Sequence, residues 1–201
     1  MKRLLVIAMA LIALGACSRV KGDWTSEEKS LINGSGDIMR VLTVADSADL
    51  AVLRGASRWL SEEDLQSREY QRLSEKMIAT VTSPEQDGVG IAGPQVGISR
   101  RVVAVQRFDK EGEPFEVYPN ITIERTYGET EPGPEGCLSV PGYRGTVSRY
   151  QNIDIKYTSL SSLRDTVENV QGFTAVIFQH ETDHLAGIIY TDKADSLEVR
   201  N

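Results

Sequence analysis

Both histidines of this 201-residue chain lie in one stretch of five residues, His180-Glu181-Thr182-Asp183-His184. On a helix, positions i and i+4 share one face, so both imidazoles can reach one metal ion. Glu181 then lies beside the ion, where its carboxylate can take a proton from water. The pattern predicts metal-assisted hydrolysis. Two histidines satisfied by hydrogen bonds at a helix surface would show the same spacing.

A cysteine in a short loop could complete such a site. The segment EGCLSVP, residues 135–141, places Cys137 between a glycine and a proline. A catalytic metal needs a third protein ligand and an open position, and two imidazoles with one thiolate provide this arrangement. The alternative for a free cysteine is a small buried hydrophobic side chain.

Four glycines fall within residues 88–97, GVGIAGPQVG, so the backbone there turns sharply or closely approaches another group. A phosphate-binding loop follows a strand and precedes a helix, whereas here a predicted helix precedes and a predicted strand follows. The order argues against nucleotide binding. Gln95 offers a neutral amide donor that can stabilise an oxyanion without competing for the metal.

The surrounding elements are predicted from periodicity. Apolar residues at helical spacing follow a Ser61 cap and predict an amphipathic N-terminal helix to about Thr82. We expect strands over residues 101–108, 116–124 and 143–147, and a hairpin of residues 153–157 and 163–167 around a turn at 159–162. A last helix should carry both histidines and end at Gly187. The face of that helix shared with the histidines should present Phe173, Val176 and Ile177. Strands between terminal helices predict an α+β fold.

The N-terminus has the features of an export signal. Two basic residues precede an apolar run over residues 4–14, which is too short to span a bilayer. Residues 14–17, LGAC, resemble the lipobox of bacterial lipoproteins, which implies cleavage after residue 16 and lipid on Cys17. We expect residues 1–16 to be the signal and residues 17–36 to be the lipid-attachment site and a flexible tether. The alternative is a cytosolic protein with an apolar tail.

Charge and cysteine content restrict the classes of partner. The formal net charge is −7, and the C-terminal residues 193–201 carry no basic cluster, so we expect no nucleic-acid partner and no docking to ribosomes. The chain has two cysteines, so lipid on Cys17 would leave Cys137 without an intramolecular disulfide partner.

Taken together, residues 88–97, 135–141 and 179–187 resemble, in order and spacing, the three signature motifs of peptide deformylases. The likeness extends from about Arg40 to Asp192 and also takes in Arg144 and Arg149, which implies a catalytic domain over residues 37–192. It implies antiparallel sheets around a central helix carrying the HExxH motif, and removal of formate from N-formylmethionyl peptides or protein N-termini.

The resemblance also assigns roles. The metal ligands would be Cys137, His180 and His184, holding one Fe²⁺ or Zn²⁺ per chain. Glu181 would transfer protons, while the Gln95 amide and the Leu138 N–H would hold the oxyanion. The substrate would be bound by Val89, Gly90, Gly136, Arg144, Val176 and Ile177.

The chain departs from the family pattern at several points. Gly93 stands where these enzymes usually carry alanine, and Pro119-Asn120 reverses the common order. Most distinctive is the export signal, which implies a bacterial, membrane-anchored enzyme facing the periplasm or the cell exterior.

Two other functions remain open from the sequence. An HExxH zinc endopeptidase would take a downstream His or Glu as its third ligand, and after His184 the chain offers only Glu198. A lipid-anchored module that binds formyl peptides without hydrolysis would keep the same scaffold.

Overall fold

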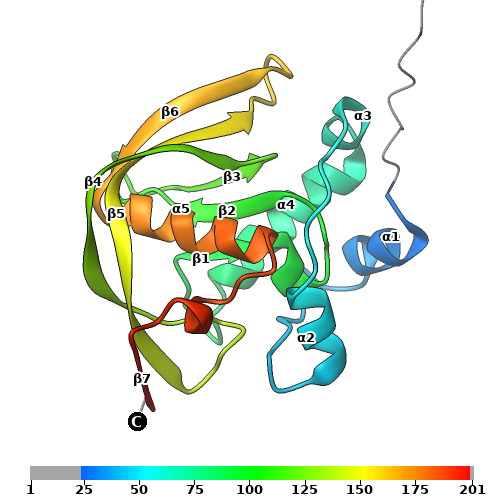
Figure 1. Cartoon of the computed structure of the whole chain (residues 1–201). Coiled ribbons are helices and arrows are strands. Elements are labelled where there is room, and N and C mark those ends of the chain that lie inside the picture. The colour runs from blue at the N-terminus through cyan, green and yellow to red at the C-terminus, as the bar shows by residue number, and fades with distance from the viewer. Residues whose placement is uncertain (1–23, 200–201) are drawn as a thin grey trace, which may run out of the picture.

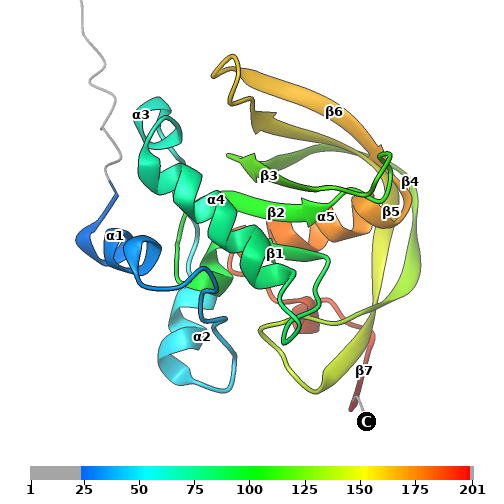
Figure 2. The ribbon, with the colours of Figure 1, turned by 180° about the vertical axis from the view of Figure 1, so that it is seen from behind.

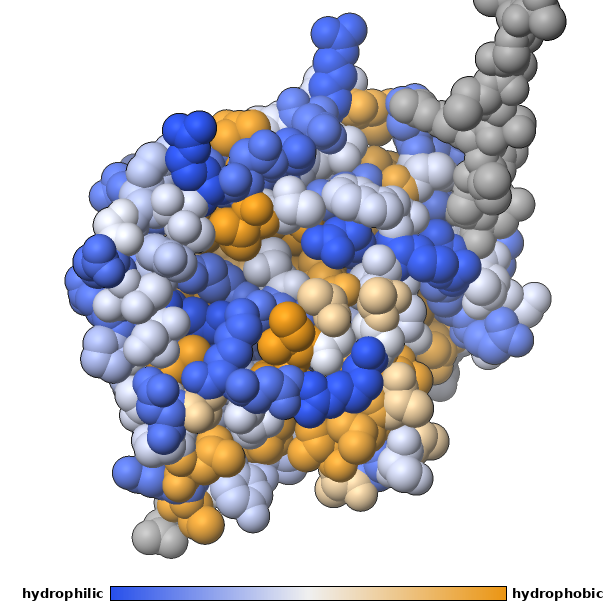
Figure 3. Space-filling model, in the orientation of Figure 1, coloured by the Kyte–Doolittle hydropathy of each residue, from blue (hydrophilic) through white to orange (hydrophobic). Residues whose placement is uncertain are grey.

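The computed structural model describes residues 24–199. The predicted signal, the lipidation site Cys17 and the first part of the predicted tether lie outside these residues. Within the described part of the chain, no helix combines the length and the hydropathy needed to cross a bilayer. Figure 3 shows hydrophilic residues over much of one face, with hydrophobic residues gathered mainly toward its lower part.

Four helices form the N-terminal part of the fold: α1 (Ser26–Asn33), α2 (Ser47–Leu53), α3 (Glu62–Leu65) and α4 (Arg68–Val81). A single helix was expected over residues 61–82, but the structure divides it before Ser67. The Ser67 hydroxyl accepts a hydrogen bond from the Tyr70 N–H (3.1 Å) and so caps α4. The same hydroxyl accepts a hydrogen bond from Trp24 Nε1 (3.0 Å).

The expectation of a flexible tether is wrong for residues 24–33. Thr25 and Glu28 form a capping box that begins α1, which packs along α4 (Figure 2). Trp24 and Ile32 are buried in the core. Polar composition does not prevent order here, because the capping box begins the helix and two apolar side chains anchor it in the core.

The first sheet comprises β1 (Gly90–Ala92), β2 (Val102–Gln106) and β3 (Phe115–Pro119), antiparallel in the order β1-β2-β3. A short 3₁₀ helix, η1 (Gly93–Val96), leaves β1. Val102 and Ala104 belong to the core cluster on the side of α4, whereas Val103 and Val105 belong to the cluster on the side of α5. Burial on both faces explains the continuous apolar run of β2.

The second sheet comprises β4 (Thr122–Glu135), β5 (Tyr143–Thr158), β6 (Asp165–Gln171) and β7 (Ser196–Val199). Strand β5 pairs with β4 along one edge and with β6 and β7 along the other, all antiparallel. The strand expected over residues 116–124 is two strands, because Asn120 has a φ of +56° and interrupts the extended backbone. Its side chain bonds to the backbone of Leu60 at both N and O.

The helix α5 (Gly172–Leu185) lies between the two sheets, in front of β1 and β2 in Figure 1. Phe178 and Leu185 pack with residues of β2, β5 and β6 in one core cluster. Gly187 follows α5 with a φ of +74°, and its N–H donates to the His184 carbonyl (3.1 Å). The chain then forms η2 (Tyr190–Asp192). The fold is therefore an α+β domain with antiparallel sheets.

Candidate metal centre and active site

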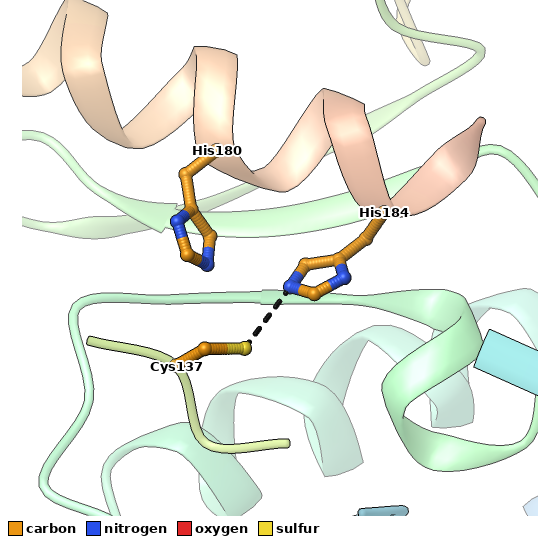
Figure 4. A group of neighbouring side chains, drawn as sticks. All are labelled: Cys137, His180 and His184. Atoms are coloured by element: carbon orange, nitrogen blue, oxygen red, sulfur yellow. Dashed lines mark hydrogen bonds between the residues drawn. The ribbon is translucent and has the colours of Figure 1, made fainter. Parts of the chain in front are cut away.

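The helix α5 and the loop after β4 bring three potential metal ligands together. His180 and His184 project from successive turns of α5 toward Cys137 in the loop (Figure 4). The Cys137 Sγ lies 3.2 Å from His184 Nε2. One ligand atom from each of the three residues lies within 4.8 Å of the others.

These distances fit a single tetrahedral ion. Metal–sulfur bonds of about 2.3 Å and metal–nitrogen bonds of about 2.1 Å at tetrahedral angles place sulfur and nitrogen about 3.5 Å apart. Both histidines are buried and Cys137 is partly exposed at the pocket. One thiolate and two imidazoles leave a fourth position facing the pocket, the arrangement that catalytic metal sites use.

A carboxylate orients the first histidine. Glu135 Oε2 lies 2.8 Å from His180 Nδ1, which leaves His180 Nε2 for a metal. Arg149 donates from Nε and Nη2 to Glu135 (2.7 and 3.0 Å) and from Nη1 to Asp183 (2.6 Å). Lys193 donates to the other Asp183 oxygen (2.7 Å). A chain of hydrogen bonds thus runs from His180 through Glu135 on β4 and Arg149 on β5 to Asp183 and the exposed Lys193.

These hydrogen bonds shift the pKa values of Glu135 and His180. Burial alone would raise the pKa of Glu135, but hydrogen bonds from His180 and Arg149 outweigh it and lower that pKa to about 2. Burial alone would lower the pKa of His180, yet its contacts with Cys137 and Glu135 raise it. Glu135 is therefore a fixed negative charge behind the potential metal ligand His180 at neutral pH.

Glu181 is a buried carboxyl group at the wall of the pocket. Its Oε2 is buried and has no hydrogen-bond partner among the described residues. Burial raises the pKa of Glu181 to about 7, and a cation nearby would lower it. Gly90 makes room for this carboxyl group, since a Cβ at residue 90 would lie 2.5 Å from Glu181 Oε1. The free oxygen is suited to exchange a proton with water or substrate.

The Gln95 side chain points its amide at the same loop. Its Oε1 accepts from the Ala92 N–H (2.8 Å), which fixes the amide orientation. Its Nε2 then lies 3.2 Å from Ser139 Oγ and 3.6 Å from Cys137 Sγ. Gln95 is almost fully buried on η1. A donor is therefore held next to the potential metal ligand.

A cavity of about 470 Å³ opens onto these groups. Its walls come from the segment between α4 and β1, from β1, from the loop after β4 and from α5. Val176 and Ile177 give it an apolar side, and the exposed side chains of Tyr143 and Arg144 lie at its mouth. The shape and lining fit an extended peptide with an apolar first side chain.

Comparison with known proteins identifies the family. A family model described as polypeptide deformylase matches residues 38–200. The chain belongs to the peptide deformylase family. A peptide deformylase of Desulforudis audaxviator is 39% identical over 132 residues, which cover 66% of this chain and 82% of that protein.

Solved structures of deformylases share the fold. A class I type b peptide deformylase from Acinetobacter baumannii bound to Met-Ala-Ser has a TM-score of 0.68 and 34% identity, covering 78% of this chain and 98% of that one. The same enzyme bound to actinonin has a TM-score of 0.68 and 35% identity, covering 79% and 99%. Deformylases depend on a metal, and the cluster of Cys137, His180 and His184 offers this chain a site for one.

The residues that the sequence assigned to a deformylase site lie together. Lining the cavity are Val89, Gly90, Gln95, Gly136, Cys137, Leu138, Arg144, Val176, Ile177, His180 and Glu181. His184 lies behind the cavity wall, beside the Cys137 sulfur. Phe173 was expected on the histidine face of the helix, and it lines the same cavity as His180, with a side chain that is 55% exposed.

Other site residues were missed. Glu135 belongs to the deformylase-like motif around Cys137, but its contact with His180 joins residues 45 positions apart and has no local signal. The resemblance includes Arg149, but nothing in the sequence pairs it with Glu135, which it contacts in the structure. Glu85 and Asp87, which follow α4, also line the cavity, and their position in a turn gave no indication of this.

Proposed function

We propose that this chain is a metal-dependent amide hydrolase that removes the N-formyl group from N-formylmethionyl peptides and releases formate. One observation carries the proposal: the potential ligands Cys137, His180 and His184 come together at the wall of a peptide-sized cavity. The same cavity is lined by Glu181, whose Oε2 has no hydrogen-bond partner in the part of the chain that the structure describes. The family match and the Met-Ala-Ser complex of the Acinetobacter baumannii enzyme support it.

Cys137, His180 and His184 would hold one divalent ion, with Fe²⁺ or Zn²⁺ as the ions that suit a thiolate and two imidazoles. When bound, the ion would lower the pKa of a water molecule toward neutrality. Glu135 keeps His180 oriented for this task, and its negative charge increases the basicity of the imidazole. Two helix-borne ligands and one loop ligand leave the cavity side open for the formyl group.

Glu181 would accept the proton of the attacking water and pass it to the leaving amine nitrogen, which completes the proton balance of amide hydrolysis. The Gln95 Nε2 group and the Leu138 N–H would donate to the formyl oxygen as its negative charge develops. Gln95 is suited to this role because the Ala92 N–H holds its carbonyl oxygen and directs its amide toward Cys137.

The peptide would bind along β1. This strand is an edge of its sheet, since the order is β1-β2-β3, so Val89 and Gly90 can pair with an extended substrate backbone. The methionine side chain would occupy the apolar wall at Val176 and Ile177. Gly136 and Arg144 would border the rest of the peptide. Loss of a backbone hydrogen bond between the peptide and this edge would raise KM and leave kcat largely unchanged.

We further propose an exported, membrane-anchored location in a bacterium. The basic start, the apolar run over residues 4–14 and the LGAC segment ending at Cys17 support it. The substrates would then be formylated peptides or protein N-termini outside the cytoplasm, with no nucleic-acid or ribosomal partner. Radiolabelled palmitate should appear on the full chain and not on a Cys17→Ala variant, and absence of label from both would end this part of the proposal.

The activity is tested by formate release from formyl-Met-Ala-Ser, with metal content measured on the same sample. The wild-type chain should release formate and Glu181→Ala should not, at equal metal content. An unformylated protein substrate distinguishes an endopeptidase, which would cut it. If metal-loaded protein bound the formyl peptide and released no formate, a binding module would replace the enzyme.

A further inference from the structure

The helix α1 lies outside the residues that match the family model, which begin at residue 38. It nevertheless packs as part of the core. Ile32 is fully buried in the cluster that contains Val96 and Ile98. The carbonyl oxygens of Ile32 and Gly34 at its C-terminal end accept hydrogen bonds from α4 side chains. Just before its first residue, Trp24 donates to Ser67 at the start of α4, so both ends of this additional helix are fixed to the rest of the domain.

A buried ion pair ties α1 to the segment that follows η1. Arg100 is 1% exposed, and its Nε and Nη2 groups donate to the two oxygens of Glu28, each at 2.8 Å. The guanidinium also lies over the Trp24 ring, 4.9 Å from its centroid. Two parallel hydrogen bonds fix the geometry of such a pair, whereas its net contribution to stability is small after desolvation. Its main effect is to set the position of Arg100.

The backbone of residues 98–100 closely approaches Gly93 at the start of η1. A Cβ at Gly93 would lie 2.6 Å from the Ile98 carbonyl oxygen and 2.8 Å from that of Arg100. The Ile98 N–H donates to the Gly93 carbonyl (2.9 Å). Gly93 is the first residue of η1, which carries Gln95 two positions later. A shift of residues 98–100 would therefore move η1 and the Gln95 amide with it.

We propose that Glu28 is a positioning residue for deformylation, and that α1 acts through Arg100 and the backbone of residues 98–100 to fix the Gln95 amide toward Cys137. The proposal rests on the function proposed above. It gives the additional N-terminal helix a role in the chemical step, separate from any role as a tether.

Glu28→Gln is the matched substitution, because glutamine keeps the capping box with Thr25 and removes one of the carboxylates that pair with Arg100. Another, Asp64 Oδ2, lies farther away, 3.4 Å from Arg100 Nη1. We expect kcat to fall about tenfold with KM within about twofold, since misplacement of a catalytic group mainly affects the chemical step. Glu27→Gln, an exposed neighbour on α1, is the control and should leave both constants unchanged.

A double-mutant cycle separates positioning from general damage. In a Gln95→Ala background, Glu28→Gln should cause no further loss of kcat, because the group it positions is gone. An equal fold-loss in both backgrounds, or an unchanged kcat in folded Glu28→Gln, would overturn the inference. If the wild-type chain itself released no formate, the proposed function would fail, so the two failures are distinguishable.

A second readout does not depend on activity. The side-chain amide signal of Gln95 in ¹H–¹⁵N spectra is assigned by its loss in Gln95→Ala, and it should shift in Glu28→Gln but not in Glu27→Gln. An unshifted signal contradicts the proposal. Should Glu28→Gln fail to fold, Leu31→Ala replaces it. Leu31 is 47% exposed, and its Cδ1 would lie 3.1 Å from a Cβ built on Gly97, the residue that ends η1. Removing this side chain therefore loosens the contact between α1 and the end of η1 at small cost in stability.

Discussion

Glu135 Oε2 lies 2.8 Å from Nδ1 of His180, on the side of the imidazole opposite to the one that faces Cys137. The contact joins the end of β4 to the middle of α5, and Arg149 holds the same carboxylate from β5. The direction of one metal ligand is thus set by residues on three elements. Such outer contacts fix the tautomer of the ring and strengthen it as a ligand.

Replacing Glu135 by glutamine should weaken metal binding. The variant loses the negative charge behind His180 and leaves the buried Arg149 without part of its partner, so we expect a roughly ten- to hundredfold loss of metal affinity. Competition with a chromophoric chelator measures this. Glu131→Gln is the control, since Glu131 is exposed on the same strand. Equal affinities for the two variants would contradict the role given to Glu135.

Gly90→Ala should impair catalysis without removing the metal. The new Cβ would lie 2.5 Å from Glu181 Oε1 and 2.9 Å from Ile177 Cγ2, so the carboxyl group must move. Displacement of a proton-transfer group of this kind lowers kcat by about a hundredfold. Gly133→Ala, where a Cβ meets nothing within 4 Å, should behave as wild type in the same assay. Retained kcat in Gly90→Ala would show that Glu181 does not need its present position.

The sequence predicted those parts of the site that depend on local spacing. His180 and His184 share a helix face because they are four residues apart, so their convergence needs no tertiary information. Cys137 lies 47 positions from His184, and only the three ordered motifs linked it to the histidines. Glu135, Arg149 and Asp183 come from three elements, and charged residues with such separations have no pattern that distinguishes them from surface charges.

The fold was predictable where burial leaves a recognisable apolar pattern in the sequence. The buried stripe of α4 follows the helical period, and the apolar run of β2 marks a short strand that is buried on both faces. Most of β4 is exposed and polar, so only its pairing with β5 makes it a strand. The break at Asn120 depends on a positive φ stabilised by contacts with Leu60, 60 positions away, and the contact of α1 with Arg100 joins residues 72 positions apart.

Arg144→Ala should affect substrate binding more than chemistry. Its side chain is exposed at the mouth of the cavity, where it can meet the C-terminal carboxylate of a short peptide. An exposed ion pair contributes about 0.2–1 kcal/mol, so KM for formyl-Met-Ala-Ser should rise by up to about fivefold with kcat unchanged. The same peptide with an amidated C-terminus should show no rise. Arg125→Ala, on β4 and outside the cavity lining, is the control, and a rise with both peptides would exclude the carboxylate contact.

Acid should weaken the attachment of α1 to the domain. Burial opposes ionisation of Glu28, but hydrogen bonds from the Arg100 side chain and the Thr25 backbone outweigh it and hold the pKa of Glu28 below its ordinary value of 4.5. The unfolded chain therefore takes up this proton first as the pH falls, so the stabilisation is complete above about pH 4.5 and is lost as the pH passes the lower, folded-state pKa.

Urea unfolding of wild type and Glu28→Gln at a series of pH values measures how much the ionised Glu28 contributes to stability. The other carboxylates titrate in both proteins, so their effects cancel in the difference. The difference in the free energy of unfolding should be constant from about pH 7 to pH 5 and should shrink below about pH 4.5. Glu27→Gln supplies the baseline for loss of one negative charge on α1. A difference that stays constant down to acid pH would mean that Glu28 has the same pKa in the folded and unfolded chain. Arg100 would then not stabilise its ionised form, and the ion pair could not be what holds residues 98–100 over Gly93.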